Sequence, residues 1–201
     1  MDIFSLNSGI ELIIGPMFAG KTTELMRRLN LYNEMNLQVL YINSNLDNRS
    51  SNFFSTHNET LKENNKIATI KTNCLHDILD QIKKYDVIGI DEGQFFNKLY
   101  DDTKYIVDIL EKKVIISGLD SDYKREPFGD IVKLVPLCDN VIKLKPFCKY
   151  CRDNGKIIPA IFTKRHSKGD TTIDVGGKDK YFPACRKCYI NNWICFILIN
   201  S

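Results

Sequence analysis

The chain has 201 residues, of which 43% are hydrophobic and 26% are charged, and its formal net charge is +3. This composition is typical of an ordinary soluble globular protein, and the length suits one full domain with a small appendage. No block of like charges is present, which argues against the clustered basic face of a nucleic-acid-binding domain. Residues 1–9 show no secretory signal pattern, and the late apolar stretch 193–199 is far below the roughly 20 residues that a membrane helix needs. We therefore expect a cytoplasmic protein without a membrane partner.

Short apolar runs alternate with helical patterns over the first three-quarters of the chain, as in an α/β domain with a parallel sheet. Strands are predicted over residues 10–14, 39–43, 67–71, 87–90, 114–118 and 141–145. Helices are predicted from the glycine-containing loop after the first strand through about residue 35, and over 75–84 and 97–112. The first helix places Leu25, Leu29 and Tyr32 on one face. Residues 45–61, rich in Asn and Ser, predict a mobile loop.

The character of the sequence changes beyond Pro146, where cysteine pairs, glycines and polar residues replace the helix–strand alternation. We therefore predict a sheet domain over residues 1–146, a small second domain over 147–192 and a C-terminal tail over 193–201. The second domain is too short to build a sufficient hydrophobic core without a covalent or metal link.

Residues 15–22, Gly-Pro-Met-Phe-Ala-Gly-Lys-Thr, match the phosphate-loop pattern G-x-x-x-x-G-K-[ST] at every position. Glycines let backbone N–H groups turn inward around anionic oxygens, and the following helix offers its positive end. Lys21 is placed to reach the β- and γ-phosphates, and the Thr22 hydroxyl is placed to ligate Mg²⁺. A preceding apolar strand and a following helix favour a nucleoside triphosphate site over a merely flexible turn. The predicted contacts are Gly15, Pro16, Met17, Phe18, Ala19, Gly20, Lys21 and Thr22.

An acidic pair, Asp91 and Glu92, follows the apolar run 87–90 directly. The carboxyl end of a parallel strand lies beside the phosphate loop, where such sheets bind ligands. Asp91 is therefore predicted to hold Mg²⁺ together with Thr22, directly or through water. Glu92 points another way, because side chains alternate along a strand, and could take a proton from an acceptor hydroxyl or orient an attacking water. The alternatives are a turn-capping acid for Asp91 and a surface acid for Glu92.

Two C-x-x-C pairs, Cys148 with Cys151 and Cys185 with Cys188, account for four of the seven cysteines. This pattern indicates tetrahedral zinc, and in a reducing compartment it argues for metal over disulfides. No open coordination position is indicated, so the zinc is expected to be structural. A thioredoxin-like redox role and a zinc ribbon that binds nucleic acid remain as alternatives.

Between the cysteine pairs, residues 173–175 (Ile-Asp-Val) suggest a short strand, and Gly176 with Gly177 permits close approach of the backbone. An aromatic side chain near such a backbone could cover a flat ligand such as a nucleobase. An ordinary hairpin explains the same pattern equally well.

Several stretches together resemble the zinc-containing type II thymidine kinases of the cytosolic and large-DNA-virus kind. They are residues 15–28, 47–49 with 56–57, 91–96, 119–120 with 123–129, both cysteine pairs, and 176–177 with Tyr181. The resemblance covers nearly the whole chain. It implies a P-loop (RecA-like) parallel sheet flanked by helices, with a small zinc-stapled lasso domain. It also implies transfer of the ATP γ-phosphoryl group to the 5′-hydroxyl of deoxythymidine, with Glu92 as general base.

The resemblance further implies the binding residues and partners. Beyond the loop 15–22, ATP would contact Asp47, Arg49, Asp91 and Gln94. The nucleoside would contact Met17, Phe95, Leu119, Tyr123, Phe128, Thr163, Ile173, Val175, Gly176 and Tyr181. Tyr123 stands where the family usually has Phe, and it is expected to stack on thymine or meet its edge. The implied cofactors are Mg²⁺ with ATP and structural Zn²⁺; the implied assembly is a homotetramer inhibited by deoxythymidine triphosphate, without nucleic acid. Residues 153–159 form a small insertion relative to the family, and the tail 193–199 lies outside its pattern.

Three other functions remain open. A P-loop ATPase acting on DNA would use Glu92 to activate water and the zinc module as a grip, and its ATP hydrolysis would be stimulated by DNA. A kinase of another deoxynucleoside or nucleotide is the second, because an apolar pocket rejects near-isosteres only weakly; deoxyuridine is a candidate secondary substrate. A non-catalytic nucleotide-binding regulator is the third.

Overall fold

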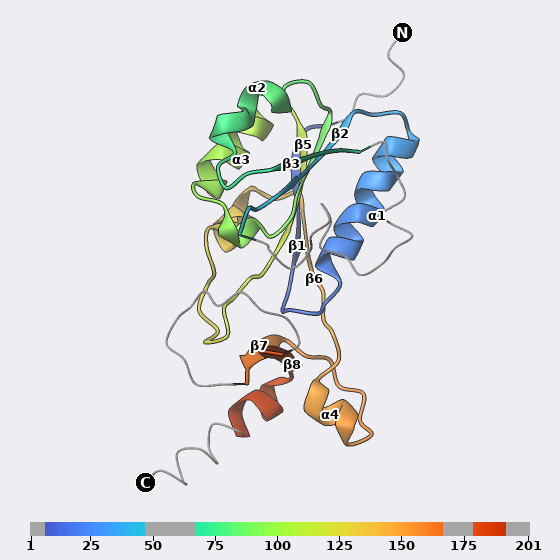
Figure 1. Ribbon diagram of the computed structural model, residues 1–201, viewed down its shortest axis with the longest axis vertical. Coiled ribbons are helices and arrows are strands. Elements are labelled where there is room, and N and C mark those ends of the chain that lie inside the picture. The colour runs from blue at the N-terminus through green and yellow to red at the C-terminus, as the bar shows by residue number, and fades with distance from the viewer. Residues whose placement is uncertain (1–6, 47–66, 167–178, 192–201) are drawn as a thin grey trace.

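The computed structural model describes residues 7–46, 67–166 and 179–191, and its centre is a six-stranded sheet (Figure 1). The strands are Gly9–Ile14 (β1), Val39–Asn43 (β2), Ala68–Lys71 (β3), Val87–Ile90 (β4), Lys113–Gly118 (β5) and Asn140–Lys143 (β6). They lie in the order β3-β2-β4-β5-β1-β6, and every neighbouring pair is parallel. All six predicted strands are present within two residues of their expected bounds, and the predicted α/β fold with a parallel sheet is confirmed.

Helices cover both faces of this sheet. Lys21–Glu34 (α1) lies on one face, and Leu79–Ile82 (α2) and Leu99–Asp108 (α3) lie on the other (Figure 1). Short 3₁₀ segments add to the framework, at His76–Ile78 (η2), Gly93–Phe95 (η3) and Ile131–Leu137 (η4). Because both faces are covered, β2 and β4 are buried along their whole length, which explains their continuous apolar sequences.

The core under α1 follows from the helical spacing of its apolar residues. Leu25 and Leu29 are fully buried against the sheet, and Tyr32 packs at the edge of the same cluster, so the predicted helix face is confirmed. Gly89 on β4 lets this helix approach closely, because a Cβ there would lie 2.4 Å from Leu29 Cδ1. A separate cluster fills the other face, under α2 and α3.

Two predicted helices are shorter than expected. The segment 75–84 contains η2 and a four-residue α2, and the segment 97–112 contains the ten-residue α3. Lys98 and Glu111 adopt left-handed backbone conformations, with φ of 55° and 54°, and these residues bracket α3. Such conformations interrupt a right-handed helix; Lys98 lies directly before α3, and Glu111 lies between α3 and β5.

The chain leaves the sheet after β6 and forms a small second unit. This unit contains Lys149–Asp153 (α4), the antiparallel strands Phe162–Arg165 (β7) and Tyr181–Ala184 (β8), and a helical segment over residues 186–191. Figure 1 shows it beyond the end of the sheet at which β1 stops. The change in architecture coincides with the predicted boundary near residue 146, although the division into domains stays a prediction.

Other expectations concern residues outside the described ranges: the strand 173–175, most of the loop 45–61 and the tail 193–201. Within the described ranges, none of the helices has the length and apolar character needed to traverse a lipid bilayer.

Candidate active site

The predicted phosphate loop connects β1 to α1 at the carboxyl end of the sheet. Gly15 has a φ of 141°, and a Cβ there would lie 2.3 Å from the Leu144 carbonyl oxygen, so no side chain fits. Gly20 caps α1 in a left-handed conformation, with a φ of 80°. The Lys21 amine donates to the Pro16 carbonyl at 3.0 Å and therefore folds back over the loop. The amino end of α1 opens onto this loop, which is the geometry that favours an anion.

Asp91 lies at the carboxyl end of β4 and is almost completely buried, with 1% exposure. Its carboxylate accepts hydrogen bonds from the Tyr41 hydroxyl at 2.9 Å, from the Ser117 hydroxyl, and from the Glu92 backbone N–H at 3.0 Å. The Thr22 hydroxyl also bonds to it. Burial, and after it the neighbouring Glu92 carboxylate, raises the pKa of Asp91 from its ordinary value near 3.8 to about 6. Asp91 and Thr22, the two residues predicted to hold Mg²⁺, are therefore in contact in the structure, while their binding of Mg²⁺ stays a prediction.

Glu92 directly follows Asp91 and has a different backbone conformation and a different side-chain partner. Its backbone is left-handed, with a φ of 53°, which is uncommon and strained for a residue with a side chain. The carboxylate is buried and accepts a hydrogen bond from Gln94 Nε2 at 2.5 Å. Gln94 Oε1 in turn accepts from the Leu119 backbone N–H at 2.9 Å. The Glu92 carboxylate is therefore linked through Gln94 to Leu119, whereas the Asp91 carboxylate is bonded to Tyr41 and Ser117.

A tight turn over residues 119–128 carries Tyr123. Asp122 stabilises the turn, because its carboxylate accepts the backbone N–H groups of Lys124 and Glu126 at 2.8 and 3.0 Å. The Tyr189 hydroxyl, from the small unit, donates to the Tyr123 carbonyl at 2.7 Å. At the end of the turn, the Phe128 ring meets the Phe95 ring edge-on, with centroids 5.6 Å apart.

A buried hydrogen bond joins the phosphate loop to the small unit. The Met17 backbone N–H donates to Thr163 Oγ1 at 2.9 Å, across 146 positions of sequence. Thr163 lies on β7, and Tyr181 is buried on the paired strand β8. Two residues predicted to contact the nucleoside, Met17 and Thr163, are therefore in direct contact.

The structure brings together many, but not all, of the predicted site residues. Hydrogen bonds link the loop 15–22, in one region, with the residues Asp91, Glu92, Gln94, Leu119 and Thr163. Five predicted residues lie outside the described ranges: Asp47, Arg49, Ile173, Val175 and Gly176. Sequence reasoning missed four positioning contacts, made by Tyr41, Ser117, Asp122 and Tyr189. A signal existed for Ser117, which is a polar residue in an otherwise apolar strand, Lys113–Gly118.

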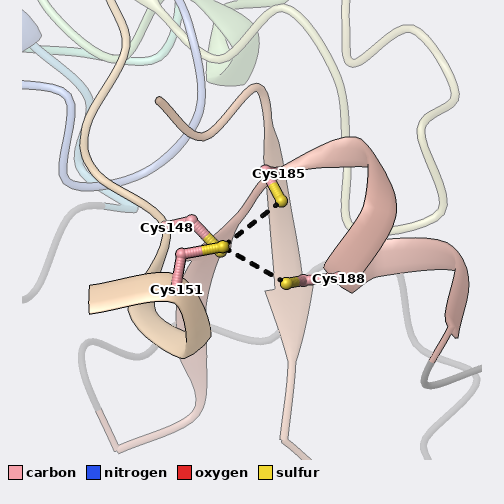
Figure 2. Close-up of side chains that lie close together, drawn as sticks. All are labelled: Cys148, Cys151, Cys185 and Cys188. Atoms are coloured by element: carbon pink, nitrogen blue, oxygen red, sulfur yellow. Dashed lines mark hydrogen bonds between the residues drawn. The ribbon is translucent and has the colours of Figure 1, made fainter. Parts of the chain in front are cut away.

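The four predicted zinc ligands converge in the small unit (Figure 2). Cys148 and Cys151 lie at and within the start of α4, while Cys185 and Cys188 follow β8. Their sulfur atoms all lie within 4.8 Å of one another, and Cys151 Sγ is 3.8 Å from Cys185 Sγ and 3.6 Å from Cys188 Sγ. Tetrahedral zinc with Zn–S bonds of about 2.3 Å separates its sulfurs by about 3.8 Å. The cluster could therefore hold a metal ion, and the gathering of both pairs favours this over a two-cysteine redox site.

A glycine loop between β1 and α1, beside the acidic end of β4, defines an α/β protein of the P-loop class. Residues 8–189 match the family model described as thymidine kinase. The chain is 42% identical to the thymidine kinase of Amsacta moorei entomopoxvirus, over 92% of this chain and 99% of that protein. It is 40% identical to the thymidine kinase of sheeppox virus (strain KS-1), over 90% and 96% of the two chains. For the thymidine kinase of vaccinia virus (strain Western Reserve) the identity is 37%, over 93% and 100%.

The chain belongs to the thymidine kinase family. The match over residues 8–189 begins one residue before β1 and ends just after Cys188, so both the sheet and the small unit are part of it. The family resemblance expected from the sequence motifs is confirmed.

Proposed function

We propose that this protein transfers the γ-phosphoryl group of ATP to the 5′-hydroxyl of deoxythymidine. The observation that carries the proposal is that the phosphate loop, Asp91 and Glu92 lie together at one end of the sheet. The hydrogen bond between Met17 and Thr163 joins the small unit to the same place. Family membership supports thymidine as the acceptor. Phosphoryl transfer depends mainly on positioning and charge neutralisation, and this arrangement suits both.

The phosphate loop and its neighbours would bind ATP. Backbone N–H groups of residues 18–21 would surround the phosphates, since Pro16 has no N–H and that of Met17 donates to Thr163, and Lys21 would leave Pro16 to reach the β- and γ-oxygens. Thr22 and Asp91 would hold Mg²⁺, and a hydroxyl beside a buried carboxylate is a fitting oxygen donor set. When bound, Mg²⁺ neutralises the developing charge on the phosphates.

Glu92 would act as general base. The 5′-hydroxyl oxygen attacks the γ-phosphorus, its proton passes to the Glu92 carboxylate, and the bond from phosphorus to the ADP oxygen breaks. Positioned general-base help contributes about 10²–10⁴ in rate.

The nucleoside would lie between the 119–128 turn and the small unit. Phe95 and Phe128 would supply apolar surface and Tyr123 a ring for the base, with Leu119 and Tyr181 at its margins. The same proposal extends to Ile173, Val175 and Gly176 as backbone partners of thymine, and to Asp47 and Arg49 near the transferred phosphoryl group.

We also propose that the cysteine cluster binds structural Zn²⁺. Four thiolates complete a tetrahedral shell and leave no open position for a substrate. Elemental analysis of purified protein should find about one zinc per chain. Cys151→Ser should lower that content and speed amide hydrogen exchange over residues 148–165, whereas full zinc retention in this variant contradicts the proposed ligand set.

One assay tests the enzymatic proposal. Purified protein is incubated with Mg-ATP and a panel of nucleosides, with and without DNA, and both ADP and nucleoside monophosphate are measured. Glu92→Gln should bind ATP and thymidine normally but lose about 10²–10⁴ in kcat. Glu34→Gln, the same change on the exposed surface of α1, is the control and should leave kcat unchanged. Wild-type turnover in Glu92→Gln refutes the role of Glu92 as general base. ADP release that DNA stimulates, without phosphorylation of any nucleoside, favours the ATPase alternative.

The homotetramer, inhibition by deoxythymidine triphosphate, and the cytoplasmic location stay predictions of the family resemblance. Sedimentation of the purified protein and inhibition curves with the triphosphate test the first two directly.

A further inference from the structure

Gln94 bridges Glu92 and the start of the 119–128 turn. Its Nε2 donates to Glu92 Oε2 at 2.5 Å, and its Oε1 accepts from the Leu119 backbone N–H at 2.9 Å. A backbone N–H can only donate, so Leu119 determines which end of the amide is the oxygen. The NH₂ group must therefore face the Glu92 carboxylate.

Two glycines leave Gln94 little room to move. A Cβ on Gly118 would lie 2.5 Å from Gln94 Oε1, and a Cβ on Gly129 would lie 2.4 Å from the Gln94 carbonyl oxygen. Gly129 also has a φ of 62°, in the left-handed region. With an exposed fraction of 5%, Gln94 is enclosed in a space that fits its present conformation. Side chains at either glycine would displace it.

The resemblance implies that Gln94 contacts ATP, and the structure shows which protein groups its side chain contacts. The side-chain amide donates one hydrogen bond to the Glu92 carboxylate and accepts one from the Leu119 N–H of the turn. Glu92 needs such a support, because its left-handed backbone alone does not fix the orientation of the carboxylate. Proton acceptance in a transfer reaction requires that orientation, and a displacement of about 1 Å can cost 10²-fold in rate.

We propose that Gln94 is a positioning residue, which holds the carboxylate of Glu92 in register with the 119–128 turn. The Leu119 N–H orients the Gln94 amide, and the amide orients the Glu92 carboxylate. Because the turn also carries Tyr123, the same two hydrogen bonds align the general base with the surface on which the nucleoside would lie. The inference deepens the proposed function and rests on Glu92 acting as general base.

A double-mutant cycle tests this role. Gln94→Met keeps the length of the side chain and removes both hydrogen bonds, and it is combined with Glu92→Gln. In the wild-type background, Gln94→Met should lower kcat about 10²-fold while the KM for ATP stays within about twofold. In the Glu92→Gln background, Gln94→Met should cause no further loss, because a residue that acts through the base has nothing left to position.

The outcomes separate the two proposals. An equal loss of kcat in both backgrounds, or a raised KM for ATP as the main effect, overturns the positioning role. If the single variant Glu92→Gln has the kcat of the wild type, the assignment of Glu92 as general base is wrong. Gln94→Asn provides a second variant in case Gln94→Met does not fold. The Asn amide is one methylene too short to reach both partners, so Gln94→Asn should also lower kcat only when Glu92 is present. A loss of kcat that is the same with Glu92→Gln overturns the positioning role in this variant too.

Discussion

The hydrogen bond between Met17 and Thr163 should make a measurable contribution to stability. Thr163→Val keeps the shape of the side chain and leaves the buried Met17 N–H without its 2.9 Å partner. An unsatisfied buried donor costs about 1–3 kcal/mol. In a chain of this size each kcal/mol shifts the unfolding midpoint by roughly 2–4 °C, so we expect the midpoint to fall by about 2–12 °C.

Thermal and urea unfolding of the wild type and the variant measure this effect. Thr69→Val on β3 is the matched control, because the Thr69 hydroxyl lies 3.5 Å from the Ile67 carbonyl, a long contact in a half-buried position. The control should change the free energy of unfolding by no more than about 0.5 kcal/mol. Equal unfolding midpoints for Thr163→Val and the wild type would refute the reasoning, since the bond would then contribute nothing.

Three further predictions follow from the site geometry. Gly15→Ala forces a Cβ to within 2.3 Å of the Leu144 carbonyl oxygen, so ATP binding measured by calorimetry should be lost and stability should fall by about 1–3 kcal/mol. The raised pKa of Asp91, about 6 against 3.8, means that the folded state binds this proton more tightly than the unfolded state does. Without Mg²⁺, stability should therefore decline by about 3 kcal/mol as pH rises from 4 through 6, and Asp91→Asn should remove that slope. Tyr189→Phe deletes the 2.7 Å bond to the Tyr123 carbonyl and should raise the KM for thymidine roughly 2–10-fold, with an unchanged KM for ATP as the internal control.

The central strands were predictable because a strand that is buried on both faces is composed almost entirely of apolar residues. The runs Val39–Asn43 and Val87–Ile90 match their predicted bounds, since every residue in them is buried. The ends of α3 were not predictable in this way. Lys98 and Glu111 take left-handed conformations that neither residue type favours, so nothing in their identity predicts the limits of α3.

Parts of the candidate site were predictable from the sequence, and other parts were not. The phosphate loop and the cysteine pairs were predictable because their chemistry demands fixed spacings within short segments. Tyr41 and Ser117 were not, because they reach Asp91 from the strands on either side of β4, and their adjacency depends on the order of strands in the sheet. Gln94 was identified, but its contact with Leu119 depends on how the chain returns through β5.

The strand order also has a consequence for synthesis on the ribosome. β1 is made first, yet its neighbours in the finished sheet are β5 and β6, and Gly9 pairs with Lys113. At translation speeds of about 5–20 residues per second, this apolar strand waits roughly 5–20 s before its first partner emerges. A nascent chain of this topology therefore exposes an unpaired hydrophobic edge for most of its synthesis, and chaperones that shield such edges should raise its yield.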